Sequence, residues 1–227
     1  MLTAEEVVEG YRAGRFVMGN SAQDPKLTWH TPDLRGYLPL QEFHIPKRLR
    51  RSLRHALHNN SWEIRLDTSF EQVLAACAEA TDKRPNTWIN PEITRIFTTL
   101  FEQEIAHTVE VWSPEGTLIG GLYGVALEGA FFGESMFSRV PNASKYALLQ
   151  LVARLRLMGF TLLDIQFFNP FFVQFGEQVQ WRQEYEENLA VALNRNAIWI
   201  DLDSLSAKSA FNFLINQGKR NASNIMP

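Results

Sequence analysis

The order of strand and helix signals between residues 107 and 166 limits the possible folds more than any other feature of the sequence. Alternating or apolar stretches separated by turn residues predict four strands, at residues 108–112, 117–125, 129–133 and 161–166. A helix is expected between the last two strands, starting at Asn142 or Ser144 and ending at Gly159. Antiparallel strands followed by a strand–helix–strand unit predict an α+β domain with a mixed sheet.

Helix-start signals organise the first hundred residues. Four helices are expected there, with start signals at Thr3–Glu6, Pro46, Thr68–Glu71 and Asn90–Pro91. The first and third of these signals have the spacing of a capping box. Residues 20–40 are rich in proline and are expected to form an irregular connection.

The chain is expected to divide into a small N-terminal lobe, residues 1–62, and a main domain, residues 63–195. The boundary is placed near residues 58–67. Residues 196–227 are expected to be a C-terminal extension to which the sequence assigns no role. A helix is expected after residue 182, then a short strand around Ala197–Asp201 and a second helix near residues 205–216.

Composition excludes several classes of protein. Hydrophobic residues make up 45% of the chain and charged residues 21%, which indicates a globular core rather than disorder. The net charge of -3 means that any nucleic-acid-binding surface must be local. Cys77 is the single cysteine, which excludes an internal disulfide, and its place on an apolar helical stripe favours a core role. The first residues do not resemble a signal peptide and no stretch is apolar enough to span a membrane, so a cytoplasmic location is expected.

A helix with a dense basic face is expected after Pro46. Leu49, Leu53 and Leu57 fall on one side of this helix and would dock it on the core. The opposite side carries Lys47, Arg48, Arg50, Arg51 and Arg54. Because no acidic residue is interspersed for ion pairing along the helix, the face either binds a polyanion or is a simple solvated surface.

The common catalytic motifs are absent from the sequence. It contains no G-x-S-x-G, HExxH, Walker or CxxC motif. The five histidines do not have the spacing of metal ligands, so neither a metal site nor a cofactor is expected.

Polar residues interrupt apolar stretches at two places. Asp164 and Gln166 lie in a short apolar strand, where alternation should put both side chains on one face. A buried carboxylate needs partners or a shifted pKa, which fits either a catalytic or a structural aspartate. Glu134 lies in residues 133–138, where a strand is expected to give way to a loop, and is either a site residue or a structural partner of Arg139.

Several short motifs also occur in the order and spacing of a known family. They are Gly120-Gly121-Leu122-Tyr123-Gly124-Val125, Gly133-Glu134-Ser135-Met136-Phe137-Ser138-Arg139, Asn142-Ala143-Ser144-Lys145, and Asp164-Ile165-Gln166 followed by Asn169-Pro170. Upstream pieces are Tyr11-Arg12-x-Gly14-x-Phe16, Trp29-His30-x-Pro32-Asp33-x-Arg35, Leu38-Pro39-Leu40, Phe43-His44 and Thr87-Trp88-Ile89. Over about residues 10–170 the chain resembles the leucyl/phenylalanyl-tRNA–protein transferase family, and residues 133–138 are the most specific part of the match.

The resemblance implies a fold and an activity. The main domain would have a GNAT-type acyltransferase fold and would follow the small N-terminal lobe. The protein would move Leu or Phe, with Met as a further donor residue, from aminoacyl-tRNA to the N-terminal Lys or Arg of acceptor proteins. This is the tagging step of N-end rule degradation. We expect a monomer that works without a cofactor and without a membrane.

The resemblance also assigns roles to individual residues. Asp164 and Gln166 match the catalytic pair, and Glu134 and Asn169 match residues that bind the acceptor. The residues matched to binding of the aminoacyl-adenosine end are Trp29, Trp112, Leu122, Phe131, Leu148 and Leu151. The residues matched to binding of the tRNA acceptor stem are Lys47, Arg48, Arg50, Arg51 and Arg54.

This assignment agrees with elementary chemistry. An aminoacyl ester is already activated, so an amine can attack it directly when the two reactants are positioned. Asp164 is expected to orient Gln166 and to help remove the amine proton, while Gln166 contacts the reacting carbonyl. The chain departs from the family at Phe16-Val17, where the family has Phe-Pro, and at residues 171–176, where the family has His-x-x-Ser-Leu-Gly.

Two other functions are compatible with the residues. An acetyl-CoA-dependent acyltransferase of the same fold would place a glycine-rich turn before the central helix, and residues 139–144 contain no glycine. A non-catalytic RNA-binding protein would need only the basic helix, and its function would survive replacement of Asp164.

Overall fold

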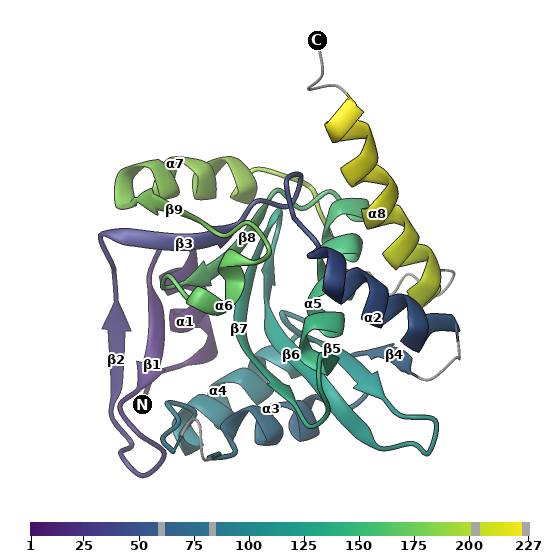
Figure 1. Cartoon of the computed structure of the whole chain (residues 1–227). Helices are drawn as coiled ribbons and strands as arrows, with labels where there is room; N and C mark the ends of the chain where they lie inside the picture. Colours follow the sequence, from purple (N-terminus) through teal and green to yellow (C-terminus); the bar gives the residue numbers. More distant parts are fainter. Residues whose placement is uncertain (59–61, 82–84, 201–204, 224–227) are drawn as a thin grey trace.

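A seven-stranded mixed sheet forms the centre of the molecule (Figure 1). The computed structural model describes residues 1–58, 62–81, 85–200 and 205–223. In sheet order the strands are β4 Glu63–Leu66, β5 Ala106–Trp112, β6 Leu118–Leu127, β7 Ala130–Ser138, β8 Leu162–Gln166, β3 Leu34–Leu38 and β9 Gln178–Trp181. Strands β7 and β8 are parallel, and the other neighbouring strands of the sheet are antiparallel. The expected α+β class with a mixed sheet is confirmed.

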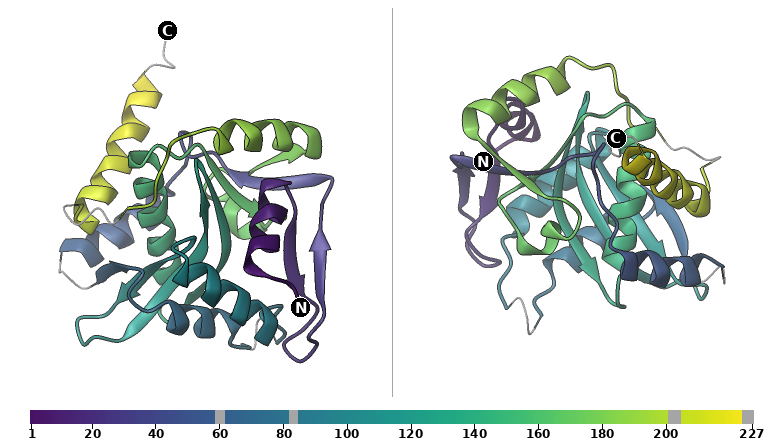
Figure 2. Two further views of the ribbon diagram at one scale, coloured as in Figure 1. Left: turned by 180° about the vertical axis from the view of Figure 1, so that it is seen from behind. Right: turned by 45° about the horizontal axis from the view of Figure 1, so that its top comes forward.

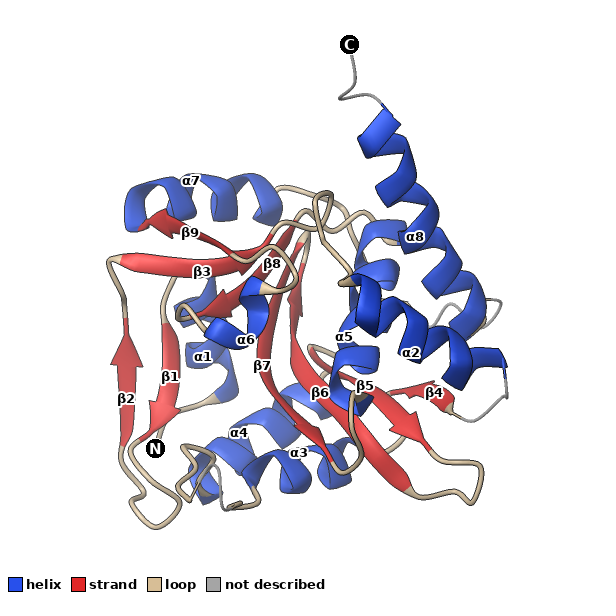
Figure 3. Ribbon diagram, in the orientation of Figure 1, coloured by secondary structure: helices blue, strands red, loops and turns tan. Residues whose placement is uncertain are grey.

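Helices cover both faces of this sheet (Figure 3). They are α1 Ala4–Arg12, α2 Lys47–His58, α3 Phe70–Ala78, α4 Pro91–Glu102, α5 Ala143–Leu157, α6 Pro170–Val173, α7 Arg182–Leu193 and α8 Ala207–Ser223. One apolar core contains residues of α2, α5 and α8, and the other contains residues of α1, α3, α4 and α7. The antiparallel pair β1 Phe16–Gly19 and β2 Leu27–His30 lies beside α1.

Helix α5 forms the connection between the parallel strands β7 and β8. The side chains expected to face inward, Leu148, Leu149, Val152 and Leu155, are all buried. The helix is buried on nearly every side, including the polar side chains of Gln150 and Arg154, because it is enclosed between other elements. Figure 2 shows it between the sheet and the pair α2 and α8. Each buried leucine contributes about 1.5–3 kcal/mol to stability.

The expected starts of α1 and α4 are confirmed. Thr3 Oγ1 accepts a hydrogen bond from the Glu6 backbone N–H at 3.2 Å, and the Glu6 carboxylate accepts one from the Thr3 N–H at 2.8 Å, which completes the capping box. Asn90 Oδ1 accepts a hydrogen bond from the Ile93 N–H at 2.9 Å, and Pro91 occupies the first position of α4.

The capping box expected at Thr68 is wrong. Helix α3 begins at Phe70, and the Thr68 hydroxyl donates to the Glu110 carboxylate on β5. Glu110 also accepts hydrogen bonds from the backbone N–H groups of Thr68 and Ser69, at 2.9 and 2.7 Å. A buried carboxylate from a distant strand therefore takes the donors that a local cap would have used. Cys77 is fully buried in α3, as expected.

Three expectations about strands are also wrong. Residues 20–40 are not irregular, because they contain β2 and β3, and the prolines lie in the connections between strands. Strand β7 does not give way to a loop after Gly133 but continues to Ser138, paired with β6. No strand forms in residues 197–200, and Asp201 lies outside the described residues. Trp199 instead anchors this segment, stacking on His107 and donating from its indole N–H to Asp67 at 2.9 Å.

The expected N-terminal lobe contributes to the main sheet. Strand β3 lies between β8 and β9, and Leu49 and Leu53 of α2 share a core with α5. The expected boundary near residues 58–67 falls partly outside the described residues. The division at residues 62 and 195 therefore stays a prediction. Within the described part of the chain, no helix is both long enough and apolar enough to cross a bilayer.

Candidate active site

A pocket opens where the parallel strands β7 and β8 separate. Their pairing covers Ala130–Phe132 and Leu162–Asp164, and beyond it β7 continues alongside β6 only. The pocket has a volume of about 260 Å³. Its apolar walls come from Trp88, Leu122, Met136, Leu148, Leu151, Leu163, Ile165 and Phe172. Its polar side chains are Glu134, Ser135, Gln166 and Asn169, together with the hydroxyl-bearing Tyr123.

Two backbone irregularities direct Glu134 and Gln166 into this pocket. Tyr123 pairs with Ser135 and Gly124 pairs with Gly133, so Glu134 is the extra residue of a β-bulge. A bulge re-aims a side chain that regular alternation would fix. Gln166 has a φ of 62°, in the left-handed region that non-glycine residues rarely adopt. The two side chains meet across the gap, with the Gln166 amide donating to Glu134 Oε1 at 3.3 Å.

Asp164 lies outside this pocket. Leu163 and Ile165 line the pocket, and Asp164 between them points to the other side of the sheet, toward Arg35 and Tyr185. The expectation that Asp164 and Gln166 share one face of the strand therefore does not describe the site, because the left-handed backbone at Gln166 ends the alternation. Asp164 still reaches Gln166 through the backbone, since its Oδ1 accepts from the Gln166 N–H at 2.8 Å.

The Asp164 carboxylate is held in a buried ion pair. Arg35 donates from Nε to Oδ1 at 2.9 Å and from Nη2 to Oδ2 at 2.6 Å, and Tyr185 donates to Oδ2 at 2.7 Å. Arg35 is 1% exposed and Asp164 is 0% exposed. Burial alone would lower the pKa of Arg35, but the charge and hydrogen bonds of Asp164 raise it. Arg35 also donates to the Gly14 carbonyl at 3.1 Å, which ties the N-terminal segment to β8.

Glu134 is a carboxyl group with an unusual proton affinity. The Tyr11 hydroxyl donates to its Oε1 at 2.7 Å. Burial is the main reason that the pKa of Glu134 is raised to about 8; the Tyr11 hydrogen bond lowers it, the charge of Asp164 raises it, and Arg35 lowers it. The alternative pairing with Arg139 is not what the structure shows, because Arg139 contacts Glu79 at 2.8 Å.

The residues expected to hold the aminoacyl-adenosine end are only partly brought together. Leu122, Leu148 and Leu151 line the pocket, as does Asn169 at its polar end. Phe131 is fully buried and stacks on Trp199, with ring centroids 5.5 Å apart.

Neither of the expected tryptophans lies in the pocket. Trp112 donates to Glu110 at 2.9 Å and lines a different cavity with Arg139. Trp29, on β2, lies against α1, where a Cβ added at Gly10 would come within 2.2 Å of its ring.

Sequence reasoning missed several residues that shape this site. Trp88 and Phe172 line the pocket, Tyr11 bonds to Glu134 in it, and Arg35 and Tyr185 hold Asp164 behind it. Trp88, Tyr11 and Arg35 occur in the motifs Thr87-Trp88-Ile89, Tyr11-Arg12 and Pro32-Asp33-x-Arg35, so the motifs carried the signal although no role was read from it.

The basic face of α2 is present as expected. Leu49 and Leu53 are buried, and the side chain of Leu57 lies outside the described part. Of the five basic residues, Lys47, Arg48, Arg51 and Arg54 are exposed and Arg50 is half-buried. The helix lies on the same side of the sheet as α5 and α8 (Figure 2).

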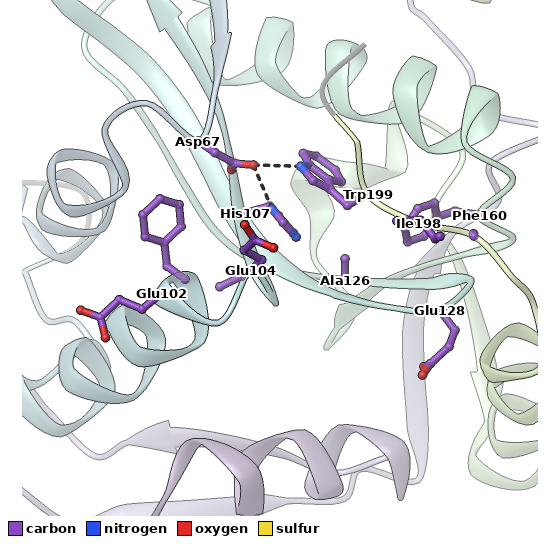
Figure 4. A pocket seen from close by; sticks show the side chains of 12 residues that line it. Asp67, Glu102, Glu104, His107, Ala126, Glu128, Phe160, Ile198 and Trp199 are labelled. Atoms are coloured by element: carbon purple, nitrogen blue, oxygen red, sulfur yellow. Dashed lines mark hydrogen bonds and ion pairs between the residues drawn. The ribbon is translucent and has the colours of Figure 1, made fainter.

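A larger cavity, of about 800 Å³, lies at the β5 side of the molecule (Figure 4). Its lining includes Asp67, His107 and Trp199, and these polar groups bond to one another: Asp67 Oδ2 is 2.9 Å from His107 Nδ1 and 2.9 Å from Trp199 Nε1. None of the residues assigned a site role in the sequence lines it. The polar contacts fasten the segment around Trp199 to the sheet.

Comparisons with known proteins agree on one family. The family model described as leucyl/phenylalanyl-tRNA protein transferase matches residues 37–190. A leucyl/phenylalanyl-tRNA–protein transferase from Paramagnetospirillum magneticum is 51% identical over 206 residues, covering 91% of this chain and 96% of that protein. Proteins of the same name from Hyphomonas neptunium and Phenylobacterium zucineum are 48% and 46% identical; they cover 85% and 84% of this chain, and the matches span 73% and 84% of those proteins. The solved structure of L-PGS from Bacillus licheniformis aligns with a TM-score of 0.39 and 12% identity over 73% of this chain and 51% of that one, too weakly to support a fold assignment.

Proposed function

Since the chain belongs to the leucyl/phenylalanyl-tRNA protein transferase family and is an aminoacyl-tRNA–protein transferase, we propose that it joins Leu or Phe to acceptor proteins that begin with Lys or Arg. Met is included as a third donor residue. The product would carry a bulky apolar N-terminus, the signal of N-end rule degradation. The cytoplasm, where aminoacyl-tRNA is made, is the proposed site of the reaction, and the active form is proposed to be a monomer.

The observation that carries this proposal is the pocket between β7 and β8, which is apolar on its walls and polar at one end. Leu122, Leu148 and Leu151 would receive the donor side chain. Such walls exclude polar side chains but discriminate weakly between apolar ones, because one methylene is worth about 1–3 kcal/mol. Trp88 supplies an aromatic face on which the terminal base can stack, a contact worth about 1–3 kcal/mol. We therefore assign the base to Trp88 rather than to Trp29 or Trp112.

Catalysis would depend on positioning, because the ester is already activated. Gln166 stands at the polar end of the pocket, where its amide can contact the reacting carbonyl. Asp164 holds the backbone of Gln166 and so fixes the direction of that amide. Holding ester and amine in reacting geometry can remove about 7–11 kcal/mol from the barrier. No covalent enzyme intermediate is needed.

Two carboxyl groups support a cationic acceptor. Glu134 lies in the pocket next to Gln166. Glu177 Oε1 accepts from the Asn169 N–H at 2.8 Å, while its Oε2 is buried with no hydrogen-bond partner among the described residues. Burial raises the pKa of Glu177, although the Asn169 hydrogen bond lowers it. An acceptor Lys or Arg side chain would satisfy this oxygen, which is why we propose Glu177 as the group that prefers basic N-termini.

The exposed basic face of α2 is the proposed contact for the tRNA acceptor stem. Phosphate contacts by Lys and Arg dominate nucleic-acid affinity and make it dependent on salt. We further propose the GNAT-type fold for the main domain. It is supported by the strand–helix–strand unit in which α5 joins the parallel pair and by the pocket that opens where this pair separates.

The test is direct transfer. The protein is incubated with radiolabelled Leu-tRNA and with peptides that differ only in beginning with Lys, Arg or Ala. The expected result is label in the Lys and Arg peptides and none in the Ala peptide. Absence of label from all three would contradict the proposal. Binding of tRNA without transfer would favour a non-catalytic RNA-binding protein instead.

A further inference from the structure

Before the N-terminal amine of the acceptor can attack the ester, it must lose a proton. An α-amino group has a pKa of about 7.7–8.0, so near neutral pH much of it is an ammonium ion that cannot attack an ester. In the described part of the pocket lining, Glu134 is the only residue with a carboxylate. If the protein has the proposed function, this carboxylate is the group in the pocket that can accept the proton.

Both oxygens of the Asp164 carboxylate already accept hydrogen bonds from other groups. Oδ1 accepts from Arg35 and from the Gln166 backbone, and Oδ2 accepts from Arg35 and Tyr185. The carboxylate is fully buried and faces away from the pocket. Taking up a proton would break at least one charge-assisted bond and leave Arg35 without its counter-ion in a buried place, which is costly. A carboxamide such as that of Gln166 has no useful basicity.

The Glu134 carboxyl group differs from that of Asp164 because it lines the pocket. Its side chain enters the pocket through the β-bulge, and its Oε1 is 2.7 Å from the Tyr11 hydroxyl and 3.3 Å from the Gln166 amide. An amine placed to attack a carbonyl bound by Gln166 is therefore within reach of Glu134. Burial raises the pKa of Tyr11, and the neighbouring Glu134 raises it further, so Tyr11 stays a hydrogen-bond donor at neutral pH.

We propose that Glu134 is the catalytic proton acceptor and that Asp164, fixed by Arg35 and Tyr185, is a positioning residue for Gln166. The acceptor ammonium gives one proton to the Glu134 carboxylate and becomes a neutral amine. The amine forms a C–N bond to the ester carbonyl carbon, and the bond from that carbon to the ribose oxygen breaks. The second amine proton goes to the ribose oxygen, which leaves as a hydroxyl, and Glu134 releases its proton to water.

The electrostatic surroundings of Glu134 suit this task. Tyr11 on α1, Arg35 on β3 and Asp164 on β8 act on it, and Tyr123 on β6 lines the same pocket. Their combined effect with burial raises the pKa of Glu134 to about 8. An acid and a base with similar pKa values exchange a proton at little cost, and efficient general bases have a pKa near the working pH.

The experiment measures single-turnover transfer from Leu-tRNA to a saturating Lys peptide as a function of pH. In the wild-type complex the bound ammonium lowers the pKa of the Glu134 carboxyl group and the carboxylate raises the pKa of the amine, because each charge favours the other. One proton is then shared between the two groups, so the rate should change little between about pH 6.5 and 8.5. In Glu134→Gln the bound ammonium must lose its proton to water. Its rate should be about tenfold lower near pH 7, because only about a tenth of an amine with this pKa is neutral there, and should rise about tenfold per pH unit up to the pKa of the amine.

Two further variants distinguish catalysis from simple attraction of a cation. Glu134→Asp keeps a carboxylate and should keep the flat profile at a lower rate. Glu128→Gln makes the same exchange at a surface residue that bonds to Arg12, and should behave as wild type. The proposal is overturned if Glu134→Gln, folded by circular dichroism, only raises the peptide KM and keeps the wild-type rate at saturation, or if Glu134→Asp shows the steep profile. Absence of transfer by the wild type would instead refute the proposed function.

Discussion

The Arg35–Asp164 pair allows a quantitative prediction, because the chain contains a surface pair with the same contact distance. Arg35 Nη2 lies 2.6 Å from Asp164 Oδ2, with both side chains almost completely buried. Arg12 Nη2 lies 2.6 Å from Glu128 Oε1, with the side chains 37% and 34% exposed. Removing one partner of a buried pair costs about 3–5 kcal/mol, since the other charge stays buried without compensation. An exposed pair contributes about 0–1 kcal/mol.

We therefore expect Arg35→Met to lower the free energy of unfolding by about 3–5 kcal/mol and Arg12→Met by at most about 1 kcal/mol. For a chain of this size the first change corresponds to a fall in Tm of about 6–20 °C. Urea denaturation followed by circular dichroism measures both. The double variant Arg35→Met with Asp164→Asn should be more stable than the sum of the single changes implies, because no unpaired charge remains. If Arg35→Met lowered the free energy of unfolding by less than about 1 kcal/mol, the pair would behave as an exposed pair, which would contradict the prediction.

Three other variants test the proposed substrate contacts. Leu151→Ala enlarges the donor pocket and should shift preference from Leu toward Phe by about tenfold, measured by competition between the two charged tRNAs; an unchanged ratio would remove Leu151 from the pocket wall. Arg51→Ala with Arg54→Ala should raise the KM for tRNA and reduce the slope of log affinity against log salt by about 2, with kcat unchanged; an unaltered slope would exclude α2 from the interface. Glu177→Gln should reduce the ratio of kcat/KM for Lys over Ala peptides by about tenfold or more, as loss of a charge-assisted contact worth about 1.5–3 kcal/mol implies, whereas an equal effect on both peptides would make Glu177 merely structural.

Regular patterns in the sequence predicted much of the fold. Alternation located β5 and β6, the start signal at Asn142 or Ser144 and the stop at Gly159 located α5, and local caps located α1 and α4. These features depend on residues close together in the sequence. The start of α3 was missed because its N–H donors are satisfied by Glu110, about forty residues away.

The sequence predicted which residues belong to the candidate site better than it predicted the directions of their side chains. Gln166, Glu134 and Asn169 line one pocket as expected, but alternation wrongly put the side chains of Asp164 and Gln166 on one face of the strand. The bulge at Glu134 and the left-handed backbone at Gln166 reverse the directions that alternation implies. The ion pair that holds Asp164 in place joins it to Arg35, 129 positions away in the sequence, so no local pattern could reveal it.

The central claim is that the aminoacyl ester and the acceptor amine meet in the pocket between β7 and β8. The most direct measurement is a crystal structure of the protein with a non-hydrolysable phenylalanyl-adenosine. The phenyl ring should lie among Leu122, Leu148 and Leu151, with the carbonyl at Gln166 and the base on Trp88. Ligand bound only in the larger cavity beside His107 and Trp199 would contradict the account.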